Sequence, residues 1–276
     1  MATIQSLKTS LGVLKRNPIL FGVGFLLAIV LLPQSALSLL GIPIVPQLIQ
    51  LLTFFITPFI VAGLFGMAYE GRVQPTSFDT FKKIGKDRYV SVLLGNLVQA
   101  AIGFVFGIVA FIAALVTLGA SLVAAGSGAN FESIGLITVA VFGLILLVFL
   151  VIMFFLQFFI AAIVADDVGV LDGFGRSIGL VKENFVSALG FSIINLVVNL
   201  AGAVPVLSVV FLFVLDSGSG AAATGGTAGA MGGGGFPLLV IAGFLVYLVA
   251  ITTVLTPFRG AFMMCFYDDH RPASAE

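Results

Sequence analysis

The residues of this sequence that could recognise a ligand are six polar side chains inside otherwise apolar stretches: Asn96, Gln99, Gln157, Ser192, Asn195 and Asn199. Asn96 and Gln99 are three residues apart and Asn195 and Asn199 are four apart, so each pair shares a helix face. Within a membrane such groups either hydrogen-bond between helices, for about 0.6 kcal/mol per contact, or line a polar cavity. The sequence leaves both interpretations open, and a cavity for a solute or a lipid headgroup would open toward the cytoplasm.

Side chains able to act as acids, bases, nucleophiles or metal ligands are almost absent from these apolar stretches. The single histidine is His270, near the end of the chain, and the single cysteine is Cys265. Histidine-based triads, two-histidine metal motifs and multi-cysteine metal sites are therefore excluded. We expect a protein that is not an enzyme and that has no catalytic residue, no metal site and no cofactor.

Arg259 is the one cation within an apolar stretch, two to three helical turns from its end. A long cationic side chain at that depth either reaches the inner interface by snorkelling or serves as a functional counter-ion. Snorkelling is the preferred interpretation.

Five carboxylates follow the C-terminal ends of expected helices: Glu70, Asp166, Asp167, Asp268 and Asp269. The helix dipole disfavours an anion at that end, so we expect compensating cations from the charged segments nearby. Asp172 is available to cap one of these segments. The alternative is that Asp268, Asp269 and His270 contribute to a cation site.

The composition places these residues in a membrane. The chain of 276 residues is 60% hydrophobic and 9% charged, whereas about a quarter of the residues of soluble domains are charged. No polar stretch is long enough for a soluble domain, so residues 1–276 are expected to form a single transmembrane domain. The net charge is zero, which gives no reason to expect a nucleic-acid partner.

Six apolar stretches are long enough to cross a hydrocarbon core of about 30 Å: Ile19–Leu40, Leu48–Met67, Tyr89–Leu122, Ile134–Ala165, Phe185–Leu215 and Phe236–Phe266. The third to fifth helices exceed the required length, so they are expected to tilt, kink or project. On the third stretch Gly103, Gly107, Ala110 and Ala114 form a stripe that lets a neighbouring backbone approach closely. The glycine-rich run 217–235 is expected to be a flexible extracytoplasmic connector.

A short amphipathic segment precedes the fifth stretch and has the pattern of a helix lying in the membrane interface. We call such a segment a stub. Its apolar residues should be shielded by lipid or by the bundle, and its cations should face headgroups or water. These residues are Leu171, Phe174, Ile178 and Val181, with the cations Arg176 and Lys182.

The stub recurs along the chain. Shifted back by 167 places, Ser177 and Asn184 fall on Ser10 and Asn17, and a shift of 96 places gives a weaker middle copy before Tyr89. We therefore predict an all-α, polytopic membrane bundle of six transmembrane helices. It would be built from three repeats of an interfacial stub plus a helical hairpin, over about residues 4–70, 75–167 and 171–269.

The Lys and Arg residues, 12 in all, belong to the stubs or to the end of the sixth stretch. None lies in the three opposite loops, so the positive-inside rule predicts that both termini are cytoplasmic, in the cell (plasma) membrane.

Short motifs resemble uncharacterised six-helix membrane proteins of archaea and, more distantly, the membrane domain attached to some glycerophosphodiester phosphodiesterases. They are the run Leu14 to Pro18, Thr57-Pro58-Phe59, and the stretch from Phe174 to Phe185. The resemblance covers nearly the whole chain and implies a six-helix membrane fold. No phosphodiesterase catalytic domain is present, so it implies no such activity.

These observations favour a non-enzymatic multi-pass membrane protein that organises or binds lipid or a partner membrane protein. The expected partners are the lipid bilayer, anionic lipid headgroups or another membrane protein. The alternative is a small transporter or channel subunit with a polar cavity open to the cytoplasm, which the repeats, the prolines and the polar residues favour.

Overall fold

The chain is folded almost entirely into α-helix. The structure, a computed structural model, describes residues 2–127, 131–221 and 238–271, and it contains no strand in those ranges. The helices there are α1 (Ala2–Arg16), α2 (Ile19–Leu39), α3 (Val45–Glu70), α4 (Phe78–Ser127), α5 (Phe131–Leu156), α6 (Phe159–Asp166), α7 (Val170–Glu183), α8 (Phe185–Ala221) and α9 (Leu238–Asp269).

Six spans in the described ranges are long and apolar enough to cross a membrane: α2, α3, α4, the α5–α6 pair, α8 and α9. The prediction of a six-span, all-α membrane protein is thereby confirmed. The first stub is α1 and the third is α7, each a separate helix ahead of its span. The predicted connector 217–235 falls mostly outside the described residues, because α8 continues to Ala221.

The predicted second stub is not a separate helix. α4 runs without interruption from Phe78 to Ser127, because no proline or turn separates the charged segment from the apolar one. The charged turns instead pack on α3, where a Cβ atom added at Gly85 would lie 2.9 Å from the ring of Phe59. The helices also extend beyond the third and fourth apolar stretches, since α4 ends at Ser127 and α5 begins at Phe131.

The predicted fourth helix is broken into α5 and α6 at Gln157 and Phe158. A buried hydroxyl from α7 stabilises the break. The Ser177 Oγ donates to the carbonyl of Phe155 at 2.7 Å and accepts from the backbone N–H of Phe158 at 3.0 Å. One side chain thus satisfies a carbonyl and an amide that the interrupted helix leaves free.

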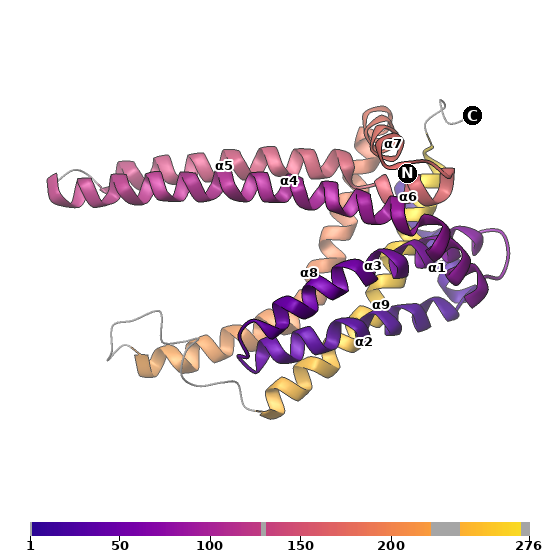
Figure 1. Cartoon of the computed structure of the whole chain (residues 1–276), viewed down its shortest axis with the longest axis horizontal. Helices are drawn as coiled ribbons and strands as arrows, with labels where there is room; N and C mark the ends of the chain where they lie inside the picture. Colours follow the sequence, from indigo (N-terminus) through magenta and orange to yellow (C-terminus); the bar gives the residue numbers. More distant parts are fainter. Residues whose placement is uncertain (1, 128–130, 222–237, 272–276) are drawn as a thin grey trace.

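The helices diverge from one crowded end of the molecule, which we call the stub end. Figure 1 shows α1, α6, α7 and both termini there, with the α4–α5 hairpin leaving in one direction and α2, α3 and α9 in another. An aromatic core fills the stub end. The rings of Phe158 and Phe266 stack at 5.1 Å, and those of Phe191 and Phe262 lie 4.6 Å apart.

Away from the stub end the helices expose their apolar sides. The most apolar window of α4 has no buried residue. The small-residue stripe is open as well, because nothing lies within 4 Å of a Cβ atom added at Gly103 or Gly107. No neighbouring backbone of the described chain therefore uses the close approach that the stripe permits, and these faces are left for lipid or for another protein.

Candidate functional site

The predicted polar residues of α8 form a line that begins beside the α5–α6 break. Ser192 donates a hydrogen bond to the Gln157 amide oxygen at 3.0 Å, and the amide nitrogen of Gln157 is buried without a partner among the described atoms. The amides of Asn195 and Asn199 donate to the carbonyls of Phe191 and Asn195, one turn back, at 3.2 and 2.7 Å. Both asparagines are half-buried.

The two predicted polar residues of α4 belong to a different part of the bundle. The Gln99 amide lies 3.6 Å from the sulfur of Met153 on α5, and Asn96 is half-buried one turn closer to the stub end. The structure thus brings Gln157 and Ser192 into contact and aligns them with Asn195 and Asn199. It places Gln99 against Met153 of α5 instead, with Asn96 one turn away on α4.

The charged residues of the stub end form an alternating chain of ion pairs, which we call the ion-pair chain. In order, it consists of Asp269, Arg72, Asp268, Arg271, Asp166 and Arg176. The nitrogen–oxygen distances along it are 2.8, 2.9, 2.8, 3.3 and 2.6 Å. The ion-pair chain connects the loop after α3 with the ends of α6 and α9 and with α7.

Asp166 lies at the centre of this arrangement, with a side chain that is only 3% exposed. A buried carboxylate needs several donors. Arg176 and Arg271 supply the cations, and the Tyr267 hydroxyl donates a further hydrogen bond. The hydrogen bond to Asp166 raises the pKa of Arg176 above its ordinary value, so the guanidinium keeps its charge throughout the physiological range.

These pairs confirm that cations compensate the carboxylates at the helix ends. Arg88, near the start of α4, binds Asp167. Glu70 is the exception, since it is held by neutral donors, the Thr76 hydroxyl at 2.7 Å and the Gln74 amide at 3.0 Å. The suggested cation site at the end of α9 is not formed, because Asp268 and Asp269 both bind Arg72.

The stub residues of α7 meet the predictions only in part. Phe174 and Val181 are buried and Lys182 is exposed, as expected. Leu171 is 84% exposed on the protein surface, so its predicted shielding would have to come from lipid. Arg176 meets its prediction only in part, because it pairs with buried Asp166 while its side chain stays 26% exposed. Asp172 does not cap the helix either, since Gly169 occupies the cap position and Asp172 lies in the first turn.

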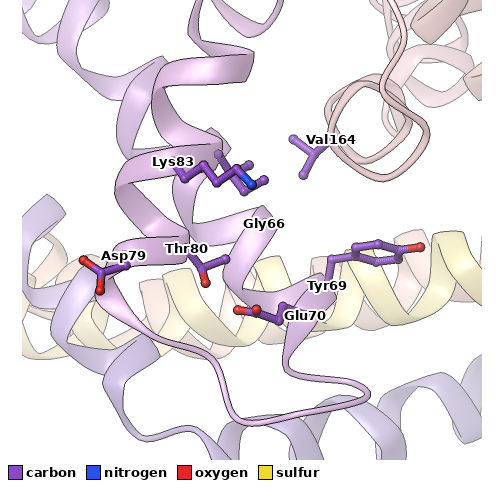
Figure 2. Close-up of a pocket in the computed structure, with 8 residues that line it drawn as sticks. Gly66, Tyr69, Glu70, Asp79, Thr80, Lys83 and Val164 are labelled. Atoms are coloured by element: carbon purple, nitrogen blue, oxygen red, sulfur yellow. The ribbon is translucent and has the colours of Figure 1, made fainter.

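A pocket of about 430 Å³ opens beside the ion-pair chain, between α3, the start of α4 and α6. Figure 2 shows Lys83 reaching across it toward Val164, with Glu70 and Tyr69 on the α3 side. The Lys83 ammonium makes no ion pair with a described residue. Its lining combines the apolar side chains of Ile84 and Val164 with the charged side chains of Glu70, Asp79 and Lys83.

The helices that carry the ion-pair chain and the polar line on α8 match a known sequence family. The model of a domain of unknown function, DUF7847, matches residues 1–270. This chain belongs to the DUF7847 family. No curated protein and no solved structure matches it.

The match covers the whole helical frame of the DUF7847 chain, from α1 to the end of α9, and so includes every member of the ion-pair chain except Arg271. It agrees with an uncharacterised membrane family and carries no assigned activity. The further resemblance to the membrane domain of glycerophosphodiester phosphodiesterases, and the archaeal origin, stay predictions.

Sequence reasoning missed two participants in the site of this DUF7847 chain. Arg271 lies beyond the sixth apolar stretch, and its spacing of three residues from Asp268 permits the ion pair that the structure has. Tyr267 directly follows the same stretch, and its hydroxyl is buried on Asp166. Only the long-range approach of α6 to α9 brings that partner close.

Proposed function

We propose that this protein is a non-enzymatic multi-pass membrane protein that organises or binds lipid or a partner membrane protein. One observation carries the proposal: the described spans are joined at the stub end and leave wide apolar faces open along their length. α4 is the extreme case, with no buried residue in its most apolar window. Such faces must be covered by lipid or by other helices.

The ion-pair chain supports a structural role for the stub end in this proposal. It joins segments far apart in sequence, from Arg72 to Arg271, without leaving an exposed acid or base at its centre. Buried ion pairs are well suited to fixing one arrangement among several. The stub end then acts as a rigid base from which the spans present their open faces.

Orientation and internal organisation complete the proposal. Both termini and the stubs face the cytoplasm of a cell membrane, on the strength of the Lys and Arg distribution. The three-repeat origin is supported by a local contact at matching positions. Asn17 and Asn184 follow α1 and α7, and the amide of each donates to the carbonyl four residues back, at 3.0 and 3.4 Å.

The experiment is purification of the full chain in a mild detergent, followed by mass spectrometry of the retained lipids and proteins. An unrelated six-span protein from the same membranes is the matched control. The proposal expects a lipid class or a protein enriched reproducibly over the control. Lipids in bulk proportion, with no enriched protein, would contradict it.

A small transporter or channel subunit is the second candidate. The observation that favours it is the polar line of Gln157, Ser192, Asn195 and Asn199, which begins near the stub end and continues into the bundle. Substrate-dependent flux into liposomes that is abolished by Asn195→Leu would establish this function in place of the first.

A further inference from the structure

The seam between α8 and α9 holds three polar side chains within a short length of the two helices. Two contacts bracket them: the rings of Phe191 and Phe262 lie 4.6 Å apart, and a Cβ atom added at Gly202 would lie 2.8 Å from Leu255. Between these contacts α8 carries Asn195 and Asn199, and α9 carries Arg259.

All three side chains leave the seam on the same side. A helix turns about 100° per residue, so Asn195 and Asn199 are rotated by about 40° and 80° from Phe191, which faces α9. Arg259 is rotated in the same sense by about 40° from Leu255, which faces α8. α8 and α9 are antiparallel. Side chains that are rotated in the same sense about the two helix axes, away from the contact, therefore emerge on the same flank of the helix pair.

The polar capacity of these residues is largely unused. Arg259 is exposed and makes no hydrogen bond or ion pair with any described residue. Each asparagine amide donates one N–H to the carbonyl four residues back in its own helix. Neither amide oxygen accepts a hydrogen bond from a described residue. The guanidinium has five donors, and each amide on the same flank keeps an oxygen and a second N–H free.

Snorkelling fits this geometry poorly. Arg259 lies ten residues before Asp269, the last residue of α9, which places it about 15 Å along the helix from that end. Side chains lean toward the N-terminus of their helix, and the N-terminus of α9 is the end remote from the stub end. The Cβ of Arg259 thus points away from the closer membrane surface.

The charge of Arg259 also lacks an internal counter-ion. The spans carry no Asp or Glu at that depth, and the nearest carboxylates, Asp268 and Asp269, are already paired with arginines. An unpaired cation in hydrocarbon is costly, so an anion from outside the chain is the favourable partner.

We propose that Arg259, Asn195 and Asn199 form a binding site for the anionic head of an amphiphile, a carboxylate or a phosphate, whose tail lies along the exposed apolar flank of α8 and α9. Guanidinium binds either anion through paired hydrogen bonds, and the amide groups orient it. The inference rests on the proposed lipid-binding function and names the ligand chemistry and the site.

The test measures binding to the full-length protein in a nonionic detergent by native mass spectrometry. The probes are oleate, oleyl phosphate, uncharged oleyl alcohol, inorganic phosphate and a two-chain phosphatidate. We expect one tightly bound oleate or oleyl phosphate per chain, with a roughly tenfold to hundredfold loss of affinity in Arg259→Gln, the range for losing a charge-assisted hydrogen bond. Lys182→Gln removes an exposed cation of the interface and is the matched control, with unchanged binding expected.

Asn199→Ala separates a built site from a snorkelling arginine. A site predicts weaker oleate binding in this variant, whereas a snorkelling Arg259 would bind phosphatidate irrespective of Asn199. Asn199 is half-buried and bonds only to its own helix, so Asn199→Ala is expected to fold. It therefore tests the site even if Arg259→Gln does not fold.

Three results would overturn the inference: equal oleate binding by Arg259→Gln and wild type, phosphatidate binding that ignores Asn199, or binding of inorganic phosphate as tight as that of oleyl phosphate. Lipids or proteins enriched from native membranes, with oleate binding independent of Arg259, would refute this site and leave the proposed function intact. Oleate binding that depends on Arg259, with no lipid or protein enriched from native membranes, would support this site and contradict the proposed function.

Discussion

At the level of single residues, burial decides which charges matter in this protein. Asp166 is almost fully enclosed and depends on Arg176, Arg271 and Tyr267, whereas Lys182, on the same helix as Arg176, is exposed. Removing one partner of a buried pair leaves a carboxylate without full compensation, while removing an exposed charge changes little.

Arg176→Gln is expected to destabilise the protein by about 1–3 kcal/mol, less than the loss of a sole partner because Arg271 and Tyr267 remain. The measurement is the thermal unfolding midpoint in detergent, followed by helicity. Lys182→Gln should leave the midpoint unchanged. Equal midpoints for both variants would show that Arg176 is an interfacial cation after all.

Ser177→Ala is expected to cost about 1–3 kcal/mol, because it leaves the buried N–H of Phe158 and the carbonyl of Phe155 without their shared partner. Ser35→Ala is the matched control, since the Ser35 hydroxyl only donates to the Leu31 carbonyl of its own helix. Denaturant unfolding of both variants checks the difference. A Ser177→Ala protein as stable as Ser35→Ala would mean that the break between α5 and α6 needs no support.

At the level of elements, glycines and prolines set how closely the helices pack. Pro257 lacks the N–H that would bond the Thr253 carbonyl within α9. Gly24 of α2 lies directly against this place, since a Cβ atom there would be 2.5 Å from the Thr253 oxygen and 2.8 Å from the Pro257 ring. The kink-forming residue and the glycine therefore belong to one contact.

Gly24→Ala should destabilise the α2–α9 contact by about 1–3 kcal/mol, because the methyl group would meet a backbone oxygen that cannot move away cheaply. Gly22→Ala, two residues earlier, adds its methyl group to open space and should be neutral or slightly stabilising, by up to about 1 kcal/mol. The two variants differ only in this contact, and their unfolding midpoints in one detergent are compared. Equal midpoints would show that α2 and α9 do not pack closely at Gly24.

At the scale of the whole molecule, the arrangement brings the two ends of the chain together. Ser6 of α1 donates a hydrogen bond to Asp269 at the end of α9, and both termini lie at the stub end in Figure 1. The charged segments lie at the same end, and the proposed topology therefore puts the stubs, the start of α1 and the end of α9 on one side of the membrane.

The topology is tested with single cysteines in a Cys265→Ala background, which removes the buried native thiol. Gly225→Cys, in the glycine run outside the described residues, should react with an impermeant thiol reagent on intact cells. Lys83→Cys, on the exposed start of α4, should react only after the membrane is opened. The opposite pattern would invert the topology.

The sequence by itself determined the membrane class, the six spans and the short amphipathic helices α1 and α7. These features follow from local composition and from the helical period, which each segment carries alone. It also determined that cations would compensate Asp166 and Asp167, because a helix end disfavours an anion wherever it lies.

Only the tertiary structure decided which cation serves which carboxylate, where the fourth span breaks, and that the charged start of α4 continues into its span. Arg72 reaches Asp268 and Asp269 across nearly 200 positions of sequence, and Ser177 supports a break some 20 residues before it. Such contacts depend on how helices from distant parts of the chain pack, and no local pattern specifies that. The same holds for the site proposed at Arg259, because only the packing of α8 on α9 puts this residue in one seam with Asn195 and Asn199.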